Sequence, residues 1–156
     1  MEATLSTEAS MLRLALRLAA PETAKLACLK LTASDGFGAG TAGALTAAGD
    51  GFALLCRALA TALGGAESLS TLRELSISKI NVSDAAAATL ASALAGHPTL
   101  TSLELWNVAL EDEGAFAVAQ LAAPPPNGNA ALKSLNLGRS LIGPEAREKL
   151  DAIIDR

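Results

Sequence analysis

The sequence predicts one α/β domain, a short solenoid of about four strand–helix repeats, with a parallel concave sheet and helices on the convex face. Three observations predict this fold: a spaced leucine template recurs, a helical pattern follows its later copies, and turn-forming residues separate strand from helix. The template L-x-x-L-x-L, with isoleucine admitted at its last position, begins at Leu26, Leu72, Leu100 and Leu132. Because one such unit cannot bury its own leucines, stacked units must share a continuous core.

A helical pattern follows each of the later templates. Between Ser83 and Gly96, alanines and leucines recur at spacings of three and four residues, which is the period of one helix face. Ser83 and Asp84 are both suitable N-caps, and Gly96 with Pro98 is a suitable end. The prolines that begin at Pro124 end the next helix, and Pro144 suits the first turn of the last one. We therefore expect strands and helices to alternate in a right-handed coil around a short parallel sheet.

One segment resembles a known family. Residues 103–115, LELWNVALEDEGA, resemble the ribonuclease-inhibitor-like class of leucine-rich repeat proteins, and the preceding GHPTL at 96–100 resembles the helix-to-strand link of that class. The resemblance implies repeats of about 28 residues and a role as a scaffold or partner-binding receptor. The class usually carries Asn or Cys at the ninth template position, where this chain has Ile80, Val108 and Ser140. We therefore expect the side-chain ladder of that position to be weak or absent.

The repeats divide residues 1–156 into the parts of a single domain. We assign an N-terminal capping helix to 1–25, a first repeat with a Gly- and Ala-rich insertion at 36–51 to 26–71, and further repeats to 72–99, 100–131 and 132–156. Capping units are needed because a bare solenoid end exposes its leucine core. The polar exterior of the last helix is expected to cover the other end.

Composition argues against several partners and cofactors. The net charge is −4 and no dense run of Lys or Arg occurs, so nucleic acid is not the expected partner. Cys28, Cys56 and His97 are too few soft ligands for a four-ligand zinc site, and we expect no metal and no cofactor. The two cysteines are interpreted as small apolar side chains in a reducing compartment.

The N-terminal region does not have the pattern of a secretory signal. Glu2 and Glu8 precede the first apolar stretch, and Arg13 and Arg17 interrupt it. No stretch is both long and apolar enough to suggest a transmembrane helix, so no membrane association is expected. We expect a cytoplasmic protein, with import into an organelle as the open alternative.

No motif supports catalysis, and we expect no enzyme. The segment 38–43 matches G-x-G-x-x-G, but it lies in the insertion and does not directly follow a strand, so a flexible loop is expected instead of a dinucleotide site. His97 has no nucleophile motif beside it and is interpreted as a helix-end residue. The acidic run 111–113 is interpreted as a complement to a helix dipole and not as a cation site.

Trp106 is the strongest binding candidate. It follows Leu105, so strand alternation turns its side chain to the face opposite the core. The matching positions of the neighbouring repeats hold Ser78 and Gly138, both small, which leaves the indole prominent. An exposed aromatic ring at the centre of a patch is typical of a binding anchor. The alternative is that the ring packs against the insertion or a loop.

The same alternation collects polar residues around Trp106 and predicts a non-catalytic protein–protein interaction module that binds through its concave face. Lys79, Glu104 and Arg139 are expected to orient the partner by charge. The full set of candidate binding residues is Trp106, Lys79, Glu104, Arg139, Asn107, Asn136, Lys133 and Arg73.

Two other functions stay open. The chain could be a structural subunit of a large multiprotein assembly, held by its helices or ends. It could also regulate a small GTPase, since one branch of the resembled repeat class does so, with Arg139 or Arg73 as the exposed arginine.

Overall fold

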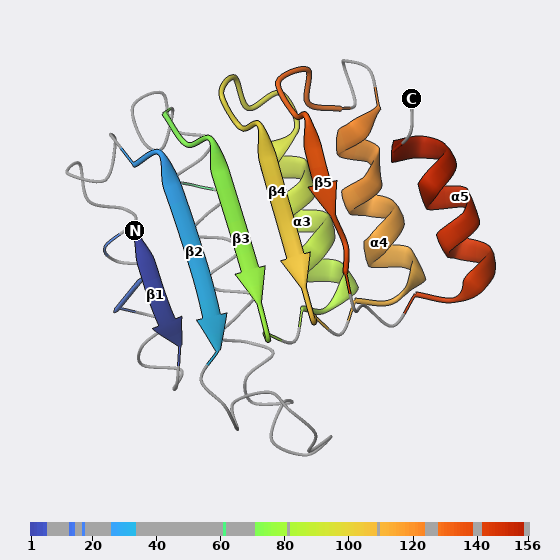
Figure 1. The fold of residues 1–156 in the computed structure, drawn as a ribbon, viewed down its shortest axis with the longest axis horizontal. Coiled ribbons are helices and arrows are strands. Elements are labelled where there is room, and N and C mark those ends of the chain that lie inside the picture. Colours follow the sequence, from blue (N-terminus) through green and yellow to red (C-terminus); the bar gives the residue numbers. More distant parts are fainter. Residues whose placement is uncertain are drawn as a thin grey trace.

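The computed structural model has an α/β fold with a parallel sheet, as the sequence predicts (Figure 1). It describes residues 1–5, 13–14, 17, 26–33, 61, 71–80, 82–108, 110–123, 128–138 and 142–154. The insertion predicted at 36–51, Cys56, Arg139 and Ser140 lie outside the described residues.

Within the described residues the sheet has five strands, and their order in space is their order in the chain. The strands are β1 (Glu2–Leu5), β2 (Cys28–Ala33), β3 (Glu74–Ser78), β4 (Ser102–Trp106) and β5 (Ser134–Asn136). Every neighbouring pair is parallel, and the pairing places equivalent template residues side by side: Leu29, Leu75, Leu103 and Leu135 form one such line. The leucine template therefore sets the register of the sheet.

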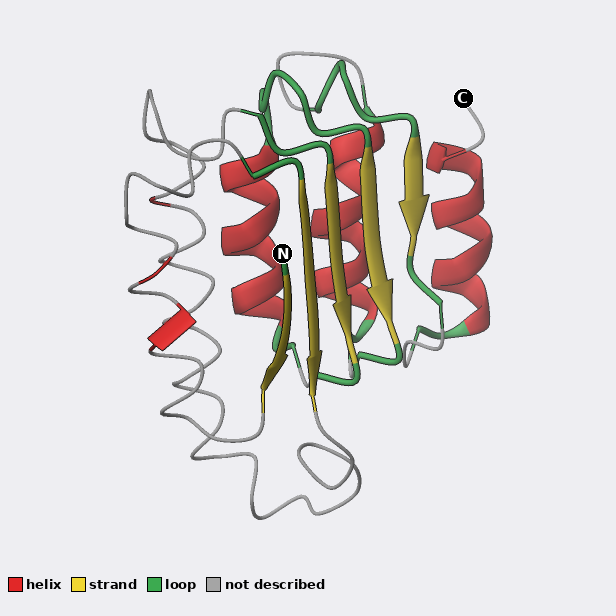
Figure 2. Cartoon of the chain, turned by 60° about the vertical axis from the view of Figure 1, so that its left-hand side comes forward, coloured by secondary structure: helices red, strands yellow, loops and turns green. Residues whose placement is uncertain are grey.

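The helices that the structure describes over their full length cover one face of the sheet and leave the other face open (Figure 2). They are α3 (Asp84–Leu94), α4 (Asp112–Ala119), the short 3-10 helix η2 (Gln120–Ala122) and α5 (Pro144–Ile154). α3 packs on α4, and α4 packs on α5. Of the two predicted N-cap residues, Ser83 is the cap, because its hydroxyl accepts a hydrogen bond from the Ala86 N–H at 3.3 Å, while Asp84 is the first residue of the helix. Among the described helices, none has both the length and the apolar character needed to cross a bilayer.

The core lies between the sheet and the helices. Strand residues alternate between the two faces, so that Leu75 and Ile77 are buried while Ser76 between them is only partly covered. Ile80 and Val108, at the ninth template position, are 3% and 2% exposed and belong to the same core. Their apolar side chains pack at the position where the resembled class usually carries Asn or Cys.

Side-chain bonds between neighbouring units nevertheless exist, and they come from aspartates at the helix starts. The Asp84 carboxylate of α3 accepts a hydrogen bond from the Glu111 N–H at 3.2 Å. The Asp112 carboxylate of α4 accepts one from the Gly143 N–H at 2.8 Å. Each bond joins the first turn of one helix to the chain just before the next helix. Asp112 therefore does more than complement the helix dipole.

The N-terminal segment differs from the expectation of a capping helix over 1–25. Residues 2–5 form β1, which pairs with β2 so that Glu2 lies opposite Lys30. Met1 packs against the core, which fixes the start of this strand. Residues 13, 14 and 17 are helical, in the part of that segment where a helix was predicted. The sheet consequently has five strands, one more than the four leucine templates predict.

Asp112→Ala is expected to lower the free energy of unfolding by about 1 kcal/mol, because the Gly143 N–H loses its acceptor. Asp112→Asn keeps an amide oxygen in place and should cost less. Urea denaturation followed by circular dichroism measures both.

Glu113→Ala is the matched control, since Glu113 is an exposed acid in the same first turn of α4. An equal loss in this control would show that the charge at the helix start matters and that the bond to Gly143 does not.

Candidate partner-binding face

The exposed face of the sheet, on the side opposite the helices, carries rows of side chains that run across the strands. Each row collects the residues that the register places side by side. The first row is Cys28, Glu74, Ser102 and Ser134; the second is Glu2, Lys30, Ser76, Glu104 and Asn136; the third is Thr32, Ser78 and Trp106, with Gly138 beyond the end of β5.

Hydrogen bonds within the rows hold the polar side chains in place. The Glu104 carboxylate accepts one from the Ser76 hydroxyl at 2.9 Å and one from the Asn136 amide at 3.5 Å. In the third row, the Thr32 and Ser78 hydroxyls are 2.9 Å apart. Both oxygens of Glu104 are thus bonded to neighbouring strands. The negative charge of Glu104 therefore lies in the middle of the exposed face, and the neighbouring Ser76 and Asn136 side chains hold it in place.

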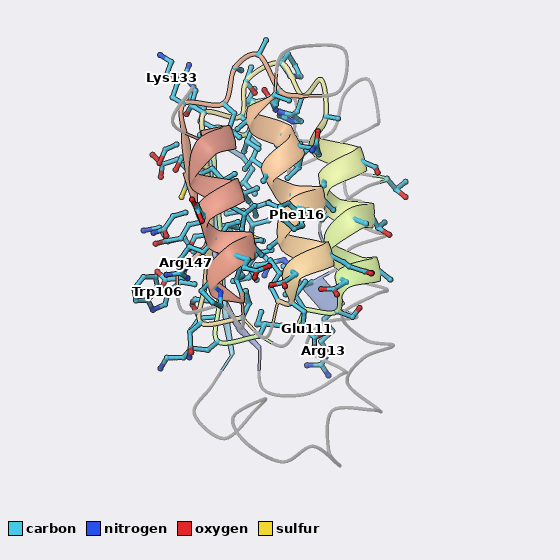
Figure 3. All side chains as sticks on the ribbon, turned by 90° about the vertical axis from the view of Figure 1, so that its right-hand side faces the viewer. Arg13, Trp106, Glu111, Phe116, Lys133 and Arg147 are labelled. Carbon is cyan, nitrogen blue, oxygen red and sulfur yellow. The ribbon has the colours of Figure 1, made fainter. Side chains whose placement is uncertain are left out.

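Trp106 ends β4 and is 40% exposed, the one large hydrophobic side chain that is exposed among the described residues. Its six-membered ring lies over Gly138, because a Cβ at that glycine would overlap Cε3 and Cζ3 of the indole. Figure 3 shows Trp106 projecting from the side of the sheet away from the helices. The small neighbour noted in the sequence is therefore the surface on which part of the ring rests.

Lys79 and Asn107 lie at the same end of the strands as Trp106, and both are exposed. Both have left-handed backbone conformations, with φ of 57° and 54°. Asn adopts this region more readily than Lys, whose presence there is uncommon. The Lys79 N–H bonds the Trp106 carbonyl at 3.0 Å, and the Asn107 N–H bonds the Gly138 carbonyl at 2.8 Å. These bonds join the turns that follow neighbouring strands, and they fix the backbone positions from which the Lys79 and Asn107 side chains extend.

Arg73 and Lys133 lie at the opposite end of the strands. Each immediately precedes a strand, and both side chains are exposed. In Figure 3, Lys133 lies near the top of the molecule, and Trp106 lies lower on the same side. The seven sequence candidates that the structure describes are therefore not one cluster: Trp106, Lys79 and Asn107 share one end, Arg73 and Lys133 share the other, and Glu104 and Asn136 lie between. The eighth candidate, Arg139, lies outside the described residues.

His97 is buried and lies away from the exposed face. It is 4% exposed, and its Nδ1 accepts a hydrogen bond from the Leu100 N–H at 3.2 Å. Asn129, buried to the same extent in the next helix-to-strand link, donates to the Leu94 carbonyl at 2.8 Å. These polar side chains satisfy backbone groups at the links. Within the described ranges, no three His, Cys, Asp or Glu residues are grouped so that they could hold a metal ion.

Cys28 lies in the first row of the exposed face, although the sequence alone predicts only a small apolar side chain there. Burial raises the pKa of its thiol, and Glu74 raises it further by a hydrogen bond and by its negative charge. Lys30 and the amino group of Met1 act in the opposite direction. The thiol is therefore held in its neutral form, which is a poor nucleophile. Cys28 has the same position in the leucine template as Glu74. This position is the feature of the sequence that predicts its place on the exposed face.

No protein-family model matches this sequence, and comparison with curated proteins finds no match either.

Gly138→Ala is expected to displace the Trp106 ring, because the new methyl group would occupy the space of the indole. Trp106 is the single tryptophan of the chain, so its fluorescence reports this directly. We expect a red-shifted emission maximum and stronger quenching by acrylamide. Ser78→Ala, on the other side of Trp106 in the same row, is the control; equal spectra for wild type and Gly138→Ala would contradict the contact.

Glu74→Gln is expected to lower the pKa of the Cys28 thiol, since it removes the negative charge that raises it. In a Cys56→Ser background, the rate of iodoacetamide alkylation against pH should therefore rise at lower pH than in the parent. Lys30→Gln should shift the same curve to higher pH. A shift in the same direction for both variants would exclude this electrostatic explanation.

Proposed function

We propose that this protein is a leucine-rich-repeat solenoid that binds a protein partner through the concave, exposed face of its sheet and catalyses no reaction. The observation that carries the proposal is the exposed Trp106 on a face that no described helix covers. Large exposed aromatic rings are the side chains that most often dominate protein–protein binding energy.

Repetition of the geometry supports the solenoid. Glu2 pairs with Lys30 across β1 and β2, and Glu74 pairs with Ser102 across β3 and β4, so the chain advances by the same length between both pairs of strands. The bonds repeat as well: the Arg73 carbonyl accepts from the N–H groups of residues 101 and 102, and the Thr101 carbonyl accepts from those of 133 and 134. The offset is longer between β2 and β3, where Cys28 pairs with Glu74, and between β4 and β5, where Ser102 pairs with Ser134. Units that stack on their neighbours through the same set of bonds are typical of repeat proteins.

The charges of the exposed face favour a protein over a nucleic acid as partner. Lys30, Lys79 and the two cations at the amino ends of the strands share the face with Glu2, Glu74 and Glu104. A face of mixed sign suits a partner with complementary charges, whereas a phosphate backbone requires mainly cations. Exposed ion pairs contribute little affinity each, so we expect Trp106 to provide most of it and the charges to set orientation.

Binding through the helices, as in a structural subunit of a larger assembly, is the second candidate. A shallow groove of about 440 Å³ runs between α3 and α4. It is lined by Ala88, Ala91, Ser92, Ala95, Ala117, Gln120 and Leu121. Small side chains allow another helix to approach closely, which is the feature that favours this alternative.

The test is a quantitative pull-down from source-cell extract that compares wild type, Trp106→Ala and Gln120→Ala at one salt concentration. We expect Trp106→Ala to lose the partner by about 30-fold or more, as for an interface residue worth 2 kcal/mol. Gln120→Ala, in the groove between the helices, should retain it. Equal circular dichroism spectra and urea midpoints establish that both variants are folded.

The opposite result, in which Trp106→Ala retains the partner and Gln120→Ala loses it, would replace the exposed face by the helical groove as the binding site.

A further inference from the structure

The outer edge of β5 forms a pocket with α5 that differs from the rest of the core. Its volume is about 290 Å³, and it is lined by Leu135, Asn136, Leu137, Gly138, Ile142, Arg147 and Leu150. Leu103 and Leu105 of β4 are 1% and 0% exposed, whereas the equivalent Leu135 and Leu137 are only partly buried. The apolar side chains of the last unit thus remain accessible at this end.

The backbone of β5 has hydrogen-bonding groups directed toward this pocket. β5 is the last strand in the sheet order, and in the described part of the chain no strand lies on its outer side. The Ser134 N–H points to β4, where it bonds the Thr101 carbonyl at 3.1 Å. Alternation in a parallel strand then directs the N–H and C=O of Leu135 away from β4. An edge of this kind accepts an extended peptide as an added strand.

Arg147 is the one charged side chain among the described residues that line the pocket. It projects from α5, and Figure 3 shows it on the same side of the helix layer as Trp106. Gly138 connects the two, since it lines the pocket and also contacts the Trp106 ring. A guanidinium in this place suits a carboxylate, which it can bind through two parallel hydrogen bonds.

The register of the sheet indicates which peptide fits. β3 and β4 each bury two apolar side chains that are two residues apart, Leu75 with Ile77 and Leu103 with Leu105. A further strand in the same register would place two such side chains over Leu135 and Leu137. Its next residue would lie beside Gly138, near Arg147.

We propose that the β5 edge binds an extended peptide of the pattern apolar–any–apolar–acidic, with the acidic side chain on Arg147. In this chain's own strands the residue at the acidic place is Thr4, Thr32, Ser78, Trp106 or Gly138. None of these is acidic, so no described strand of this chain carries the pattern, and at 108–111, where the sequence does match it, Val108 and Leu110 are buried in the core. The occupant is therefore taken to be a partner protein. The site does not require a partner on the exposed face.

The first test uses an end-capped, fluorescein-labelled peptide, Lys-Thr-Leu-Ser-Leu-Glu-Ser-Lys, and measures fluorescence anisotropy with the full chain. We expect saturable binding that Arg147→Glu weakens at least tenfold. A peptide with Lys in place of the Glu should bind Arg147→Glu better than it binds wild type. Glu148→Gln is the control, because Glu148 is exposed on the same helix and does not line the pocket.

The second test addresses the added strand. In the proposed register, the N–H of the Ser between the two leucines donates to the Leu135 carbonyl, while the N–H of the first leucine points away from β5. N-methylation of that Ser should abolish binding, and N-methylation of the first leucine should leave it within a factor of two.

Absence of binding to wild type at 1 mM peptide, equal binding to Arg147→Glu, or equal effects of the two N-methyl groups would each overturn the proposal. These outcomes can be told apart from failure of the proposed function, because that function is tested by a different variant, Trp106→Ala, in a pull-down from cell extract.

Discussion

The side-by-side alignment of leucines across parallel strands is the constraint on which the rest of the structure depends. Leu29, Leu75, Leu103 and Leu135 lie in one line, and their side chains bind the sheet to the helix layer. A shift of one residue in any strand would turn its leucines to the exposed face and its polar residues into the core. The register that buries the core therefore also builds the rows of the exposed face, including the position of Trp106.

The bonds that join the strands and helices act between neighbours. The Thr101 carbonyl takes N–H groups from the next unit, and the carboxylates of Asp84 and Asp112 each reach the chain before the next helix. A structure held together in this way has complete contacts in its middle and fewer at its end. Leu135 is only partly buried, whereas the equivalent Leu103 is fully buried, because Leu135 belongs to the last unit of the sheet.

The exposed face combines a fixed polar middle with a prominent ring at one end. Glu104 is bonded from both sides, which lowers the conformational freedom that a partner would otherwise have to restrict. Trp106 rests partly on Gly138, so a residue without a side chain decides how the ring lies. Preorganised polar groups around one aromatic ring are an arrangement suited to recognition, and the adjoining β5 edge adds an apolar surface with a cation at its rim.

The sequence by itself determined the α/β class, the strands from Cys28 onward, the helix start at Ser83 and the outward phase of Trp106, because these follow from local periodicity and capping. The sequence does not predict strand β1, since four residues are too short for a periodic signal and their pairing with β2 is not local. Only the tertiary structure decided the carboxylate bonds of Asp84 and Asp112, the effect of Glu74 on Cys28, and the division of the candidate residues between two ends of the sheet. Each of these depends on a distance between residues far apart in the chain, which periodicity does not encode.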